Sequence, residues 1–125
     1  MSENELATII INIAFQIHST LGPGLLESVD EEIMFHELTR QNIFAERQKA
    51  VPVHWNDLKM DVGFRADIIV ENKVIVELKS IESLAPVHSK ILLTYLRATG
   101  MKLGLLINFN EELIRNGIKR VVNNL

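Results

Sequence analysis

The stretch VGFRADIIVENKVIVELKS, residues 62–80, decides the fold class expected for this chain. Two runs rich in Ile and Val flank Glu71-Asn72-Lys73, a pattern that predicts two core strands joined by a hairpin turn. Asp67, Glu77 and Lys79 interrupt these runs. Because charged side chains are seldom fully buried without a partner, their place in a predicted core hairpin calls for a chemical reason.

Strand alternation predicts that one face of this hairpin is wholly apolar and that the other carries the charges. The apolar face is expected to hold Phe64, Ala66, Ile68, Val70, Val74, Val76 and Leu78. The other face is expected to hold Arg65, Asp67, Ile69, Ile75, Glu77 and Lys79.

The length of the turn decides which residues face each other. A three-residue turn pairs Val70 with Val74 and places Asp67 opposite Glu77, whereas a two-residue turn mixes the two faces, so we favour the former. Opposed carboxylates, with Cβ atoms roughly 5 Å apart, repel each other and raise each other's pKa. A divalent cation between them removes this penalty, and hard oxygen ligands suit Mg²⁺. The alternative is an exposed cross-strand charge network without catalytic chemistry.

The rest of the chain predicts one α/β domain over residues 1–125. Apolar spacing predicts helices over about residues 4–20, 25–41 and 85–99. Further strands are expected near residues 43–47, 51–55 and 103–109, while residues 111–123 fit either a helix or a strand.

The composition excludes several classes of function. The chain has no cysteine, which excludes disulfides, thiolate zinc sites and cysteine nucleophiles and fits the reducing cytoplasm that we expect as its location. It has no apolar span of about 18 residues, so no membrane association is expected. The net charge of -3 argues mildly against a nucleic acid partner, although an acidic metal site would also lower the charge.

Several blocks of the chain resemble the PD-(D/E)XK nuclease superfamily. Asp67 followed by VELK at residues 76–79 resembles the D…ExK motif of that superfamily. IHSTLGPGLLESVDEE at residues 17–32 and the block at residues 76–109 resemble the GxxExxY protein family within it. The resemblance covers about residues 5–123 and implies a restriction-endonuclease-like fold, with a mixed four-stranded sheet flanked by helices.

The resemblance implies a metal-dependent nuclease that hydrolyses phosphodiester bonds in DNA or RNA. Asp67, Glu77 and Glu27 would bind Mg²⁺ or Mn²⁺, helped by the backbone carbonyl of Leu78. Lys79 would orient or deprotonate the attacking water and stabilise charge on the phosphate. A nucleic acid is the expected partner, and a homodimer is left open.

Two positions depart from the GxxExxY pattern. Asp30 stands where the motif has its tyrosine, and Ile91 stands where the family often has a glutamine that would contact the substrate or the water. Asp30 either adds a ligand beside Glu27 or is an exposed acid. His18 and His88 are further candidates to line the site. The departures favour, as an alternative function, a catalytically impaired module that binds nucleic acid or a protein partner.

Overall fold

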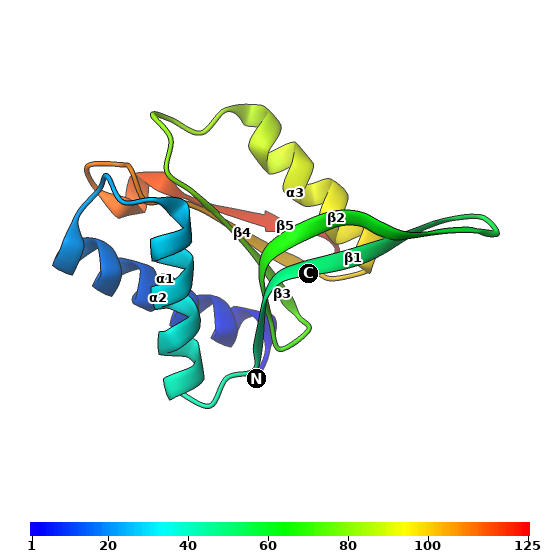
Figure 1. Cartoon of the computed structure of the whole chain (residues 1–125), viewed down its shortest axis with the longest axis horizontal. Coiled ribbons are helices and arrows are strands. Elements are labelled where there is room, and N and C mark those ends of the chain that lie inside the picture. Colours follow the sequence, from blue (N-terminus) through cyan, green and yellow to red (C-terminus); the bar gives the residue numbers. More distant parts are fainter.

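The computed structural model describes all 125 residues, which form three helices, five strands and one short 3-10 helix (Figure 1). In chain order the elements are α1 (Glu3–Leu21), α2 (Glu27–Arg40), β1 (Ala45–Trp55), β2 (Leu58–Val70), β3 (Val74–Lys79), α3 (Pro86–Thr99), β4 (Leu103–Asn108), η1 (Ile114–Gly117) and β5 (Ile118–Val122). None of the helices is both long and apolar enough to cross a membrane.

The strands form one mixed sheet with the order β1-β2-β3-β4-β5. Strands β3 and β4 are parallel, and every other neighbouring pair is antiparallel. This arrangement confirms the predicted mixed α/β class, but the sheet has five strands where the resemblance implied four. The two strands expected near residues 43–47 and 51–55 form the single strand β1. The additional strand is β5, which comes from the segment that the sequence left open between helix and strand and which pairs with β4 from Leu103–Val122 to Ile107–Ile118.

Helices cover both faces of the sheet (Figure 1). Helices α1 and α2 cover the larger core, whose sheet side chains include Ile68, Val70, Val74, Val76, Leu78, Leu103, Leu105 and Ile107. Helix α3 covers a smaller core, which contains Val51, Ala66, Ile69, Ile75, Leu92, Leu96 and Leu106. The central strands are therefore buried from both sides, which explains their near-continuous apolar runs.

The β2–β3 hairpin has the predicted register. Val70 pairs with Val74, Ile69 with Ile75 and Ile68 with Val76, which confirms the three-residue turn. The ladder ends at the last of these pairs, so Asp67 and Glu77 lie just beyond the point where the two strands separate.

The prediction that one face of β2 is apolar along its whole length was wrong. Phe64 and Ala66 pack on the α3 side of the sheet, whereas Ile68 packs on the opposite side. The change of face occurs at Asp67, which lies opposite Gln48 in β1, between the pairs Arg47–Ile68 and Lys49–Ala66. Gln48 has a left-handed backbone with φ 47°, a conformation that is costly for a residue with a side chain.

Candidate active site

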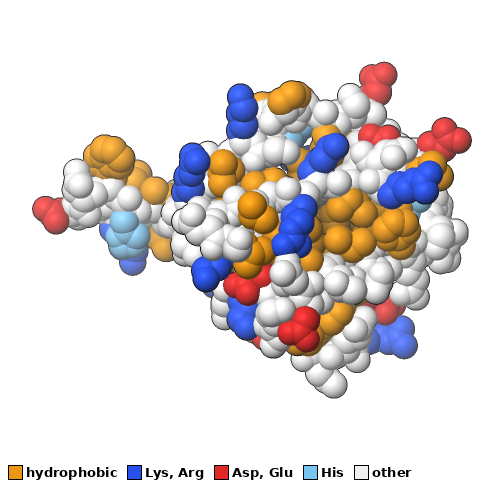
Figure 2. All heavy atoms as spheres, turned by 180° about the vertical axis from the view of Figure 1, so that it is seen from behind, with side chains coloured by type: hydrophobic (Ala, Val, Ile, Leu, Met, Phe, Trp, Pro, Cys, Tyr) orange, Lys and Arg blue, Asp and Glu red, His pale blue; other side chains and the backbone are white.

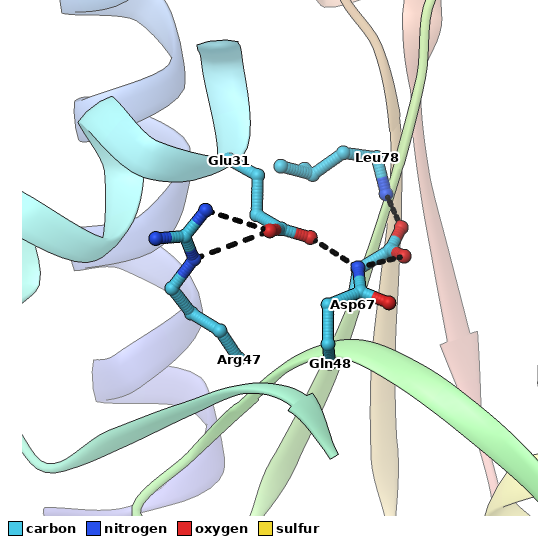
Figure 3. Close-up of polar contacts among 5 residues, drawn as sticks. All are labelled: Glu31, Arg47, Gln48, Asp67 and Leu78. Atoms are coloured by element: carbon cyan, nitrogen blue, oxygen red, sulfur yellow. Dashed lines mark hydrogen bonds and ion pairs between the residues drawn. The ribbon is translucent and has the colours of Figure 1, made fainter. Parts of the chain in front are cut away.

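The carboxylate of Asp67 is held by groups from the strands on both sides of it (Figure 3). Its Oδ2 atom accepts a hydrogen bond from the backbone N–H of Leu78 at 2.8 Å. Its Oδ1 atom accepts a longer hydrogen bond, at 3.3 Å, from the side-chain amide of Gln48. The Asp67 carboxylate thus accepts a hydrogen bond from β3 beyond the last backbone pair of β2 and β3. The two hydrogen bonds fix the orientation of this carboxylate.

A polar network connects Asp67 to α2. The same Gln48 amide donates to Oε1 of Glu31 at 2.7 Å, and Arg47 donates to Oε2 of Glu31 from Nε at 3.2 Å and from Nη2 at 3.0 Å (Figure 3). An amide nitrogen is a donor only, so it is suited to the space between two carboxylates. The guanidinium of Arg47 also lies 5.6 Å from the ring centroid of Phe35, within the range of a cation–π contact.

Glu77 is a buried carboxyl group whose charge has no compensating partner. The residue is 8% exposed, and its Oε1 atom has no hydrogen-bond partner. Burial and, to a lesser extent, the neighbouring Asp67 carboxylate raise the pKa of Glu77 to about 9, while Lys79 acts in the opposite direction. In the absence of a cation, this carboxyl group is therefore protonated at neutral pH.

The alternative interpretation of the hairpin, an exposed charge network, is wrong. No ion pair joins any two of Arg65, Asp67, Glu77 and Lys79, since the ion pairs of the structure involve other residues. Glu77 is also buried, whereas a solvated network would leave it exposed. The cost of burying the Glu77 carboxyl group is consequently not offset by an ion pair within the hairpin.

Glu77 and Lys79 share a small cavity on the α3 side of the sheet. Its volume is about 40 Å³, and it is lined by Glu77, Lys79, His88, Ile91, Leu92, Tyr95 and Leu106. The Nδ1 atom of His88 accepts a hydrogen bond from the Ala85 N–H at 2.9 Å, so the neutral ring carries its proton on Nε2. His88 thus lines the cavity, as one sequence-based alternative expected.

Tyr95 belongs to the same cavity and was not singled out as a site residue from the sequence. Its ring stacks on Phe64 with ring centroids 3.9 Å apart, which attaches α3 to β2 close to Asp67. Burial raises the pKa of Tyr95, and the carboxylates of Glu77 and Asp67 raise it further. The phenol is therefore a neutral hydrogen-bonding group at the edge of the carboxyl pair.

Asp67 and Glu27 share a second cavity, of about 180 Å³, which is lined by Glu27, Ser28, Glu31, Gln48, Asp67 and Leu78. The carboxylate of Glu27 accepts a hydrogen bond from the Ser80 N–H at 3.0 Å. No three His, Cys, Asp or Glu side chains converge closely enough to form a complete set of metal ligands. Of the expected set, Asp67 and Glu77 are close enough to interact electrostatically, although they line different cavities, and Glu27, at the start of α2, lines the cavity of Asp67.

Asp30 lies apart from both cavities. It is 1% exposed, and neither of its carboxylate oxygens has a hydrogen-bond partner, so the alternative that it is an exposed acid is wrong. Burial raises the pKa of Asp30 to about 6, and the nearby His18 opposes this shift. His18 itself makes a 2.7 Å hydrogen bond between its Nε2 atom and the backbone carbonyl of Glu111, which is a structural contact.

Sequence reasoning missed the side chains that support the site, namely Glu31, Arg47, Gln48 and Tyr95. Glu31 had a usable signal, because it follows Glu27 by four residues and so lies on the same face of α2. Gln48 had none, since its role depends on a left-handed backbone conformation in a strand.

A comparison with models of protein families identifies the superfamily of the chain. A sequence model described as PD-(D/E)XK nuclease superfamily matches residues 4–121, a range that includes every candidate site residue. Neither the comparison with curated proteins nor that with solved structures gave a match.

Proposed function

Because the chain belongs to the PD-(D/E)XK nuclease superfamily, we propose that it is a metal-dependent nuclease that hydrolyses phosphodiester bonds in DNA or RNA. The observation that supports this activity best is the buried carboxyl group of Glu77 beside the half-buried carboxylate of Asp67, with Lys79 two residues further along the strand of Glu77. A buried carboxyl group next to a second carboxylate destabilises the fold, so a chemical function is its simplest explanation.

A divalent metal ion suits this pair, and nucleases of the superfamily generally use such ions. The buried Oε1 atom of Glu77 has no partner in the protein, and the pair offers the hard oxygen donors that Mg²⁺ prefers. We propose Mg²⁺, with Mn²⁺ as the other candidate, bound by Asp67 and Glu77 together with the Leu78 carbonyl. Glu27 would join this set by releasing the Ser80 N–H.

Each side chain of the site would have a distinct role in hydrolysis. When bound, the cation supplies Lewis-acid stabilisation of the charge that develops on the phosphate. Asp67 keeps its orientation through the Leu78 N–H and the Gln48 amide, so this side chain would need little rearrangement to bind the cation. Lys79 lines the same cavity as Glu77. It orients the attacking water and adds positive charge beside the scissile phosphate.

A catalytically impaired module that binds nucleic acid or a protein partner is the second candidate function. Ile91 supports it, because this apolar side chain lines the cavity of Glu77 and Lys79 where the resemblance expects a glutamine. We also propose that the chain is a member of the GxxExxY family, that it acts in the cytoplasm and that it forms a homodimer.

A cleavage assay tests the proposed activity. A mixture of single- and double-stranded DNA and RNA is incubated with the protein, with Mg²⁺ or Mn²⁺ and separately with a chelator. We expect cleavage of at least one nucleic acid with metal and none with chelator. Asp67→Ala should be inactive, and Glu112→Ala, which removes an exposed carboxylate outside the site, should retain activity. A wild-type protein that cleaves nothing with either metal would favour the binding module.

A further inference from the structure

The end of the β1–β2 hairpin, residues 52–62, projects away from the rest of the protein and is called the arm below (Figure 1). It exposes an unusual amount of apolar surface: Trp55 is 71% exposed, Leu58 58%, Val62 56% and Met60 38%. Single exposed apolar residues are ordinary, but a group of them on one projecting element is typical of an interaction site.

The apolar side chains of the arm lie mainly on one face. Trp55 pairs with Leu58 and Val53 with Met60, while the intervening pair, His54 with Lys59, points to the opposite face. Figure 2 shows hydrophobic side chains on one side of the arm, His and basic side chains on the other, and an acidic side chain at its end.

The root of the hairpin is covered by α3. There Val51 pairs with Phe64, and both pack in the core under this helix. The register of the two strands shifts between Val51 and Val53, and beyond this shift the apolar side chains of the arm are exposed. Pro52 lies in β1, the edge strand of the sheet, and lacks the N–H that would pair with an added strand, so the face of the arm is a better contact surface than its edge.

Helix α3 offers a complementary surface on the same side of the sheet. Val87 and Ile91, four residues apart and so on one helical face, are 52% and 42% exposed. The helix contains no acidic residue and carries Lys90 and Arg97, both exposed and in no ion pair.

The arm carries Asp57 at its tip and Asp61 nearer its root, both exposed and in no ion pair, with Lys59 between them. Two acidic residues against one basic residue give the arm a net negative charge, which is opposite in sign to the charge of α3. An arm that extends away from its own α3 reaches this helix only in another molecule. Reciprocal contacts of this kind close into a symmetric dimer, in which each copy both gives an arm and receives one.

We propose that the protein forms a homodimer by reciprocal arm exchange, in which the Trp55 face of each arm packs on Val87 and Ile91 of the other copy. Asp57 and Asp61 then approach Lys90 and Arg97 of the other copy. Because Ile91 also lines the cavity of Glu77 and Lys79, the arm of one copy borders the candidate active site of the other. The acidic tip disfavours a phosphate backbone as the occupant, and the dimer does not depend on the proposed nuclease activity.

The experiment uses two charge-reversed variants of the full chain. The first variant carries Asp57→Lys and Asp61→Lys, and the second carries Lys90→Glu and Arg97→Glu. Wild-type protein should sediment at twice the 14.2 kDa chain mass, each variant alone should sediment as a monomer, and an equimolar mixture should restore the dimer. The mixture restores both contacts, because each arm then meets a helix of opposite charge. Variants that dimerise alone like the wild type, or a mixture that stays monomeric, would overturn the proposal.

Trp55 provides a second readout, because it is the only tryptophan of the chain. Its emission should shift to shorter wavelength, and its quenching by acrylamide should fall, as the wild-type concentration rises through the dimer range. Ile91→Lys should abolish this change, while Leu113→Ala, which truncates an exposed apolar residue outside both surfaces, should not. If added nucleic acid shields Trp55 and the protein concentration has no effect, the proposed dimer is wrong. The arm would then be a contact surface for nucleic acid.

Discussion

The Oδ2 atom of Asp67 accepts a hydrogen bond from the Leu78 N–H at 2.8 Å, just where the backbone ladder between β2 and β3 has ended. A side chain thereby takes the place of a backbone acceptor between two central strands. Because Leu78 is 1% exposed, its N–H has no access to water if this acceptor is lost. The proposed metal ligand is therefore also a structural residue.

Substitutions of Asp67 separate these two roles. Asp67→Ala leaves the Leu78 N–H unpaired and should lower the free energy of unfolding by about 1–3 kcal/mol. Asp67→Asn keeps an acceptor oxygen for the Leu78 N–H, gives up only the longer bond from Gln48 and removes the charge beside Glu77, so without metal it should be neutral or stabilising. Urea denaturation in chelator measures both. A loss of several kcal/mol in Asp67→Asn would show that the charge itself holds a structural network.

The pKa of Glu77 predicts a dependence of stability on pH. In the folded chain this pKa is about 9, against 4.5 for an unperturbed glutamate, so the unfolded chain releases the proton at lower pH. The contribution of Glu77 to stability is thus fully present below about pH 4.5 and is lost as the pH rises towards 9.

Glu77→Gln has no proton to lose at this position and should lack that dependence. Relative to the wild type without metal, it should gain a few kcal/mol in its free energy of unfolding between about pH 5 and about pH 9. Denaturation at several pH values in chelator gives this difference. A difference that stays constant across the range would mean that Glu77 is ionised in the folded protein.

Metal binding should appear as added stability. A cation that binds only the folded chain raises its free energy of unfolding by about 1.4 kcal/mol per tenfold increase in free ion above the dissociation constant. We expect Mg²⁺ to raise the melting temperature of the wild type and to leave Asp67→Ala and Glu77→Gln unchanged. Equal responses of all three proteins would place any bound metal elsewhere.

The Glu31 network predicts a contrast between two neighbouring cations of β1. Arg47→Ala leaves the Glu31 side chain, only 8% exposed, without its ion-pair partner and should cost about 2 kcal/mol or more. Lys49→Ala removes an exposed pair with Glu46 and should cost at most about 1 kcal/mol. Thermal melts of both variants compare them directly, and equal costs would contradict a supporting role for this network.

The sequence predicted the class of fold and the hairpin register because both depend on apolar periodicity and turn length. The grouping of Asp67 with Glu77 followed from that register, although the strands separate just before the pair. The change of face at Asp67 could not be predicted, because it coincides with a left-handed conformation at Gln48 in the neighbouring strand, which no pattern in the sequence marks. The additional strand β5 was missed because its short run of mixed residues is compatible with either a strand or a helix.

The rate of nucleic acid cleavage by Lys79→Ala, measured beside the wild type under single-turnover conditions with Mg²⁺, tests the central claim most directly. Lys79 lines the cavity of Glu77 but is not a proposed metal ligand, so its loss should spare metal binding. We predict a rate at least about 100-fold below that of the wild type, with the Mg²⁺-dependent rise in melting temperature retained. Cleavage by Lys79→Ala at the wild-type rate would contradict the proposed active site.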